Sequence, residues 1–142
     1  YFPTKTDFYR ECLAAAGRRI LRTTAPDPDT NGPEQVRTML RLMLEQIDRR
    51  RDFYLRLVHG SPTPGQEVVG VYDTLRSTTT DRVVAALGLT ARAERDVVHA
   101  WWAYVEDRAL TWSATPASAR TESVDDVVAH CERALAALRT LP

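Results

Sequence analysis

The chain has 142 residues, a length that fits one domain burying roughly two-thirds of its unfolded surface around a single core. Lys and Arg number 19, as do Asp and Glu, so the chain lacks the broad positive field that would by itself hold nucleic acid or an anionic membrane. No apolar run reaches the ~18 residues of a membrane span and no signal peptide is visible, so we expect a cytoplasmic protein without a membrane partner. Cys12 and Cys131 are isolated and lack metal-ligand spacing, which indicates reduced, buried thiols.

The first expected helix begins at Thr4 in the segment TKTD. A Thr hydroxyl followed three residues later by an acid satisfies amide groups that a helix start leaves unpaired. Apolar residues then recur at helical spacing: Phe8, Cys12, Leu13, Ala16, Ile20 and Leu21. The polar, Pro-rich loop at 25–33 ends this helix.

A second helix is predicted to start near Asn31 or Gly32, because Pro33 suits a first helical turn. Its apolar stripe consists of Val36, Met39, Leu40, Met43, Leu44 and Ile47. The charged segment 48–52 predicts a helix end or bend, and we interpret its three arginines as a solvated surface in preference to an anion site. Residues 53–58 predict a short separate helix that ends at Gly60.

The fourth helix is expected to open at a cap in residues 63–66, TPGQ, and to end before Gly88, which readily takes the left-handed conformation. Residues 77–80, STTT, are poor helix formers and favour a kink or break within it.

The most informative helix is expected at 90–112. On a helical wheel, one broad apolar face contains Val98, Trp101, Trp102, Val105, Ala109 and Trp112. Val97 and Tyr104 widen it on one side, and a polar edge of His99, Glu106 and Ser113 borders the other. A last helix starts at Ser123, which the acid three residues later completes as a capping box. The prediction is an all-α fold of about six helices.

Few residues point to catalysis. Asp96 and His99 share a helical face, but a di-iron site requires two Glu-x-x-His pairs and two further Glu. His99 and Glu106 lie about 10 Å apart along a helix axis, too far for a direct acid–base pair. We therefore expect no enzymatic activity, no metal and no cofactor. A small helical enzyme that uses His99 or Glu106 is the least favoured hypothesis.

Apolar and aromatic residues with a few polar groups suggest a cavity for a small, mostly apolar ligand, although such residues most often form a simple core. The candidate ligand-binding residues are Met39, Met43, Tyr54, Tyr72, Arg76, His99 and Trp102. The two C-terminal helices also suggest a homodimer, in which two helices from each chain form a four-helix bundle. The candidate interface residues are Trp101, Val105, Trp112, Val128, Cys131 and Leu135. A monomeric core that buries large rings is the alternative.

The segment YFPTK at residues 1–5, followed by Asp7 and Phe8, resembles the junction between the DNA-recognition helix and the first core helix of TetR-family transcriptional regulators. The chain has Thr6 where the family more often has an acid. The order of helices resembles the TetR regulatory domain over the whole chain. The resemblance implies that residues 1–3 are the remnant of a recognition helix, and that 4–142 form a ligand-binding and dimerisation domain.

The resemblance also implies that Lys5, and with it Tyr1, contacts DNA phosphates, while the helix-turn-helix itself lies outside this chain. The expected function is a ligand-responsive regulator, with a repressor favoured, whose effector changes the affinity of the dimer for operator DNA. The effector must bind the two dimer arrangements with different affinities to shift their populations. The alternative is a stand-alone helical module that binds a small molecule or a partner and does not bind DNA.

Overall fold

The computed structural model describes residues 4–60 and 69–142, which form six α-helices and one short 3₁₀ helix and contain no strand. The elements are α1 (Lys5–Thr23), α2 (Gly32–Arg49), α3 (Arg51–His59), α4 (Val69–Ala86), α5 (Arg92–Ser113), η1 (Ala117–Ala119) and α6 (Val124–Arg139). The prediction of an all-α fold of about six helices is confirmed.

Three helices begin where capping residues predicted them. The Thr4 side chain accepts a hydrogen bond from the amide of Asp7 at 3.0 Å, and the side chain of Asn31 caps α2. Ser123 and Asp126 form the predicted capping box, with bonds of 3.1 and 2.8 Å. Each such cap contributes about 1 kcal/mol.

Glycines mark two helix ends and one close approach. Gly60 and Gly88 follow α3 and α4 with φ of 79° and 65°, a conformation that other residues seldom adopt. At the start of α2, a Cβ added to Gly32 would lie 1.8 Å from the carbonyl oxygen of Ala86. The end of α4 therefore rests directly on the first turn of α2.

The prediction of a break within the fourth helix is wrong, since α4 runs unbroken from Val69 to Ala86. The hydroxyl of Thr79 donates to the carbonyl of Leu75 at 2.9 Å, and the hydroxyl of Thr80 donates to the carbonyl of Arg76 at 2.8 Å. Both hydroxyls are thus satisfied within the helix that they were expected to interrupt. The predicted cap at 63–66 lies outside the described residues.

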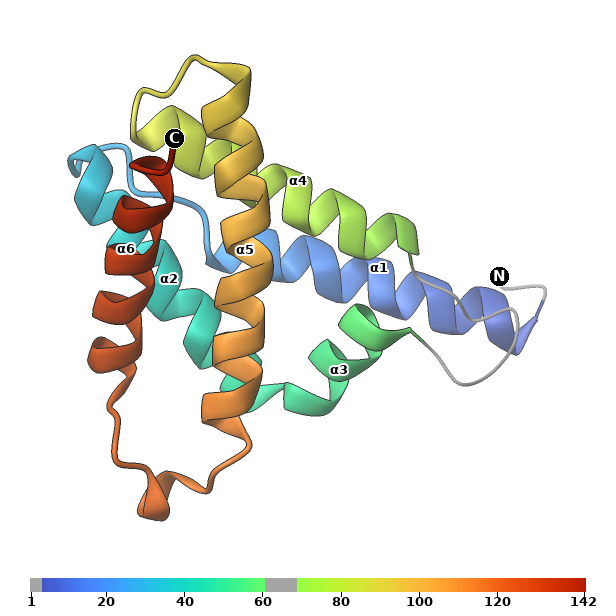
Figure 1. Cartoon of the computed structure of the whole chain (residues 1–142). Coiled ribbons are helices and arrows are strands. Elements are labelled where there is room, and N and C mark those ends of the chain that lie inside the picture. The colour runs from blue at the N-terminus through green and yellow to red at the C-terminus, as the bar shows by residue number, and fades with distance from the viewer. Residues whose placement is uncertain (1–3, 61–68) are drawn as a thin grey trace.

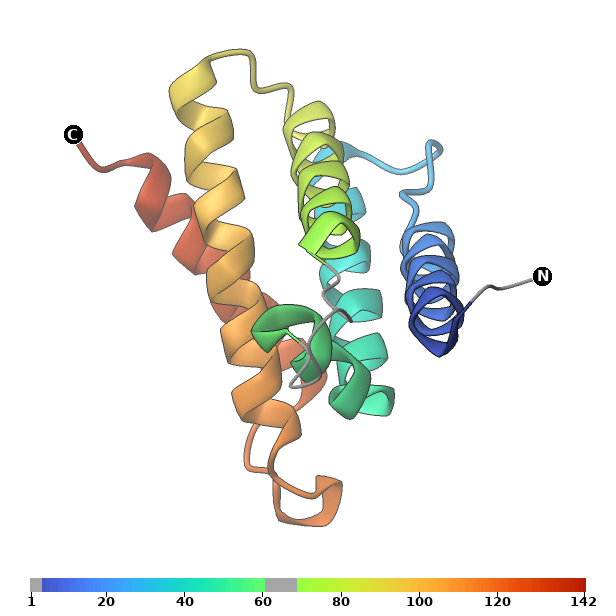
Figure 2. The ribbon, with the colours of Figure 1, turned by 90° about the vertical axis from the view of Figure 1, so that its right-hand side faces the viewer.

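The helices form a bundle with α1 at one edge. Helices α5 and α6 lie side by side and antiparallel, as Figure 1 shows, with α2 packed against both. Helix α4 lies against α5, α2 and α1, and α1 lies at the edge farthest from α5 and α6 (Figure 2). No helix in the described part of the chain is both long and apolar enough to cross a membrane.

The core lies between α2, α4, α5 and α6, and its two largest fully buried side chains are tryptophans. Trp101 and Trp102 are at most 1% exposed, with ring centroids 5.2 Å apart. The indole N–H of Trp101 donates to the carbonyl of Cys131 at 2.8 Å, which joins α5 to α6. Cys131 is a buried free thiol, as predicted, whereas Cys12 is exposed on α1, because the surface of α1 that carries it faces away from α4.

Candidate ligand-binding site

Three polar side chains lie between α4 and α5: Tyr72, Arg76 and Glu106. We call them the polar cluster. The hydroxyl of Tyr72 donates to Glu106 Oε2 at 2.8 Å. Arg76, one turn further along α4, donates through Nε and Nη2 to the carbonyl of His99, at 3.1 and 2.7 Å. Glu106 is only 7% exposed, so the cluster places a carboxylate inside the bundle.

Burial controls the electrostatics of this cluster. Desolvation raises the pKa of Glu106, although the Tyr72 hydrogen bond and the charge of Arg76 act in the opposite direction. Burial and the Glu106 carboxylate raise the pKa of Tyr72 to about 12. Burial, together with the charge of Arg76, lowers the pKa of His99. The cluster therefore has a carboxylate with increased proton affinity, a group able to accept a hydrogen bond from a ligand or to pair with its positive charge.

The structure brings three of the predicted ligand-binding residues, Tyr72, Arg76 and His99, together. The other four are at most 3% exposed and belong to the closed core: Met39, Met43, Tyr54 and Trp102. Tyr54 donates its hydroxyl to the sulfur of Met43 at 2.9 Å. The indole nitrogen of Trp102 is buried and has no hydrogen-bond partner among the described residues. These four side chains fill the centre of the bundle, and none of them lines the hollows described below.

An apolar hollow lies instead between α1 and α4, and we call it the α1–α4 hollow. It has a volume of about 220 Å³ and is lined by Ala14, Gly17, Arg18, Leu21, Gly70, Val71, Thr74 and Leu75. The helices are in close contact at its floor, where a Cβ added to Gly17 would lie 2.9 Å from Val71 Cγ1. A small apolar group fits this site, although none of its lining residues belongs to the predicted set.

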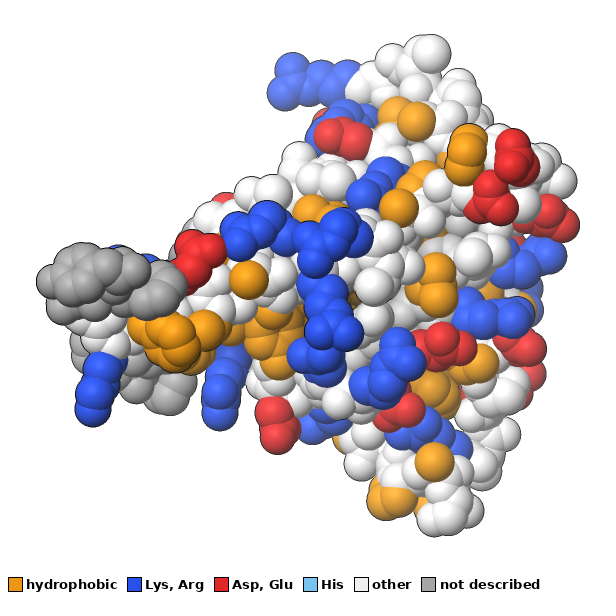
Figure 3. Space-filling model, turned by 180° about the vertical axis from the view of Figure 1, so that it is seen from behind, with side chains coloured by type: hydrophobic (Ala, Val, Ile, Leu, Met, Phe, Trp, Pro, Cys, Tyr) orange, Lys and Arg blue, Asp and Glu red, His pale blue; other side chains and the backbone are white. Residues whose placement is uncertain are grey.

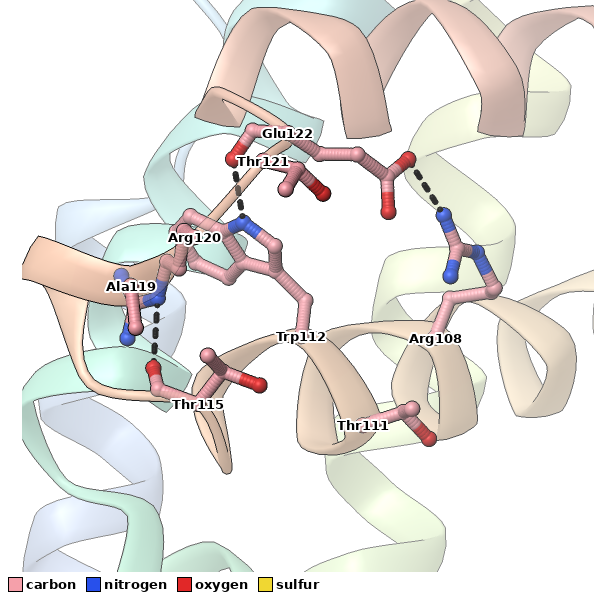
Figure 4. Close-up of a pocket in the computed structure, with 8 residues that line it drawn as sticks. All are labelled: Arg108, Thr111, Trp112, Thr115, Ala119, Arg120, Thr121 and Glu122. Carbon is pink, nitrogen blue, oxygen red and sulfur yellow. Dashed lines mark hydrogen bonds and ion pairs between the residues drawn. The ribbon is translucent and has the colours of Figure 1, made fainter.

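A second hollow, of about 200 Å³, lies where α5 passes into the loop before α6 (Figure 4). Its polar groups bond mainly to one another. Arg108 pairs with Glu122 at 3.0 Å, and the indole N–H of Trp112 donates to the Glu122 carbonyl at 3.0 Å. Arg120 donates to the carbonyl of Thr115 at 2.8 Å and lies 4.1 Å above the Trp112 ring. These bonds fix the loop, and we assign the hollow no ligand.

The residues predicted for a dimer interface are located mainly inside one chain. Five of them are at most 5% exposed: Trp101, Val105, Val128, Cys131 and Leu135. They pack α5 and α6 against each other and against the rest of the bundle, and so offer no surface to a second chain, which corrects their assignment. Trp112 is partly exposed, at the end of α5.

The residues predicted to touch DNA lie at the start of the chain. Lys5 is exposed on the first turn of α1, and Tyr1 lies outside the described residues. Lys5 is exposed and forms no ion pair with an acidic side chain of the described residues.

The predicted ligand-binding set left out Glu106 and Gly17. Glu106 was placed on the polar edge of its helix, yet it is buried against α4. The signal was present, because Tyr72 and Arg76 at one-turn spacing provide a donor and a positive charge for a buried acid. A glycine inside a helical pattern, such as Gly17, often indicates close approach of another helix.

Comparison with protein-family models, curated proteins and solved structures gave no match. Across residues 4–60 and 69–142, no three His, Cys, Asp or Glu side chains are grouped so as to hold a metal ion.

Proposed function

We propose that this chain is the regulatory domain of a ligand-responsive transcriptional regulator, similar to those of the TetR family. A small, mostly apolar effector binds in the α1–α4 hollow and changes how strongly the dimer holds operator DNA. The resemblance of residues 1–8 to the family junction motivates the DNA-binding part of the proposal.

The observation that carries the proposal is that α1 serves both sites. Lys5 lies at its first turn, and Gly17 and Leu21 form one wall of the hollow further along the same helix. A ligand that wedges between α1 and α4 changes the angle of α1 and so moves the end that carries Lys5. The polar cluster lies on the other side of α4, where Tyr72 and Arg76 bond to α5. These bonds hold α4 in place, so α4 is the fixed wall of the hollow and α1 is the wall that moves.

The proposed dimer uses the outer face of α5 and α6. The side chains of this face are partly or fully exposed and are mostly small or aromatic: Val97, Ala100, Tyr104, His130, Ala134 and Ala137. Tyr104 of α5 stacks on His130 of α6 with ring centroids 5.9 Å apart, so the two helices are joined on this face. Light scattering should give twice the 16.0 kDa chain mass, and Ala100→Arg should give a monomer. Ala85→Arg, at an exposed position of α4, should remain dimeric.

Ligand binding is tested with N-phenyl-1-naphthylamine, an uncharged apolar dye whose emission rises in apolar surroundings. Thr74→Phe fills the hollow from α4 and should weaken dye binding about tenfold, because the ring occupies the site. Ala85→Phe places the same ring at an exposed position of α4 outside the hollow and should bind dye like the original chain. Equal binding by all three proteins would refute the assignment of the hollow.

The DNA-binding part is tested by sequencing the gene upstream of the codon for Tyr1. The proposal expects a Lys- and Arg-rich helix-turn-helix segment there. A reading frame that begins at Tyr1 would remove the DNA-binding role and favour the alternative, a stand-alone small-molecule-binding module.

A further inference from the structure

An arginine-lined hollow lies on the opposite side of α1 from the α1–α4 hollow. It has a volume of about 600 Å³ and is lined by Arg19 and Thr23 of α1, Gln46 and Arg49 of α2, and Arg50. Ligand pockets in proteins commonly have volumes of roughly 300–1,000 Å³, so this space suits a small molecule. Figure 3, which views the molecule from behind, shows positively charged side chains gathered across the middle of that view.

The three arginines lack acidic partners. Within residues 4–60 and 69–142, no carboxylate forms an ion pair with Arg19, Arg49 or Arg50. The nearby Asp48 is engaged elsewhere, since both of its oxygens accept from Arg120, at 2.6 and 3.0 Å. The chain as a whole is neutral, so this hollow concentrates positive charge that the fold itself leaves unbalanced.

The two uncharged side chains of the hollow bond to each other. The side-chain amide of Gln46 donates to the hydroxyl of Thr23 at 3.3 Å, which joins the ends of α1 and α2. The Thr23 hydroxyl also donates to backbone carbonyls of its own helix, so it is fully engaged. The donors left for a ligand are therefore guanidinium groups, which bind phosphate oxygens in a two-pronged arrangement.

We propose that this hollow binds a small molecule carrying two or more phosphate groups. Three positive charges within one space match a ligand with several negative charges, and each guanidinium presents five N–H donors. Operator DNA is a poor occupant, because Arg19 lies about 21 Å along α1 from Lys5, at ~1.5 Å rise per residue. The site is independent of the apolar effector and of the DNA-binding role. It revises the interpretation of Arg49 and Arg50 as solvated surface.

The test is isothermal titration of the purified chain with pyrophosphate at low salt. Arg19→Gln and Arg49→Gln should each weaken binding about tenfold or more, because each removes hydrogen bonds to a charged group. Arg133→Gln is the matched control, since Arg133 is exposed on α6 and makes no ion pair among the described residues. It should leave the affinity unchanged. Orthophosphate should bind more weakly than pyrophosphate, and raised salt should weaken both.

Three results would overturn the proposal. The first is no measurable binding of pyrophosphate, and the second is an equal loss of affinity in the Arg133 control. The third is displacement of pyrophosphate by duplex DNA at a lower concentration than by further pyrophosphate, which would make the hollow a nucleic-acid contact. Circular dichroism of each variant, together with its melting temperature with and without pyrophosphate, separates lost binding from lost folding. If pyrophosphate does not raise the melting temperature of the original chain, while the arginine variants lower it, the arginines only stabilise helix C-termini.

Discussion

Replacing Arg120 by alanine should lower the free energy of unfolding by roughly 2–4 kcal/mol, since hydrogen bonds to charged groups contribute about 1.5–3 kcal/mol each when buried and less when partly wet. The Arg120 side chain is 12% exposed and its two terminal nitrogens donate to Asp48, at 3.0 and 2.6 Å. Its Nε donates to the carbonyl of Thr115 at 2.8 Å. Asp48 is 33% exposed, so water partly replaces the lost donors and keeps the effect below the sum of three buried bonds.

Urea unfolding followed by far-ultraviolet circular dichroism measures this effect. Arg120→Lys keeps the positive charge but cannot make the paired hydrogen bonds to Asp48. It should therefore recover less than half of the unfolding free energy lost in Arg120→Ala. Arg139→Ala is the matched control, because Arg139 reaches Glu94 only at 4.0 Å and both side chains are well exposed; it should change stability by less than about 0.5 kcal/mol. A double-mutant cycle with Asp48→Asn should give a coupling of about 1–2 kcal/mol. If Arg120→Ala behaves like the control, or Lys fully replaces Arg, the paired hydrogen bonds from Arg120 to Asp48 do not stabilise the fold.

Three further predictions concern Glu106, Gly32 and the two cysteines. Because burial raises the pKa of Glu106, the stability gained from its proton is fully present below its ordinary pKa of 4.5 and is lost as pH rises through the folded-state pKa. Relative to Glu106→Gln, the original chain should therefore lose stability as pH rises, measured by urea midpoints over a pH series. Gly32→Ala should destabilise the fold by about 2 kcal/mol or more in the same assay, since the added carbon meets the backbone of Ala86. A thiol reagent should modify Cys12 in the folded chain and Cys131 only after unfolding, because Cys131 is buried and burial raises its pKa to about 11.

Each of these three predictions has an outcome that would contradict it. Parallel pH curves for the two Glu106 proteins would show that its pKa is the same folded and unfolded. A Gly32→Ala protein as stable as the original would show that α2 and α4 separate at little cost. Two thiols reacting at one rate in the folded chain would contradict the burial of Cys131.

The helices were predictable because their signals are local. Thr4, Asn31 and Ser123 each cap a helix through a bond to an amide a few residues away, which depends on sequence spacing alone. Gly60 and Gly88 end helices for an equally local reason, their left-handed backbone. The break expected at residues 77–80 is absent because helix propensity is a weak guide once tertiary packing fixes the helix, and Thr hydroxyls can bond within it.

The sites were less predictable because they depend on which faces meet. A helical wheel shows that Trp101 and Val105 share an apolar face, but cannot show whether that face meets its own bundle or a second chain. Met39 and Met43 likewise fit a core and a cavity equally well in sequence. The hollow between α1 and α4 arises from the approach of Gly17 to Val71, two residues 54 positions apart in the chain, and no local pattern encodes that distance.

The three tryptophans of α5 occupy three different environments. Trp101 donates to a carbonyl inside the core, Trp102 is buried with no partner for its indole nitrogen in the described part of the chain, and Trp112 is partly exposed beneath an arginine. A water-soluble quencher should reach only Trp112, leaving the blue-shifted emission of the buried pair. The chain thus has two intrinsic fluorescence reporters: Trp112 senses the loop end of α5, and the two buried tryptophans sense the core. Quenching read alongside emission wavelength distinguishes a local rearrangement from general unfolding without any added label.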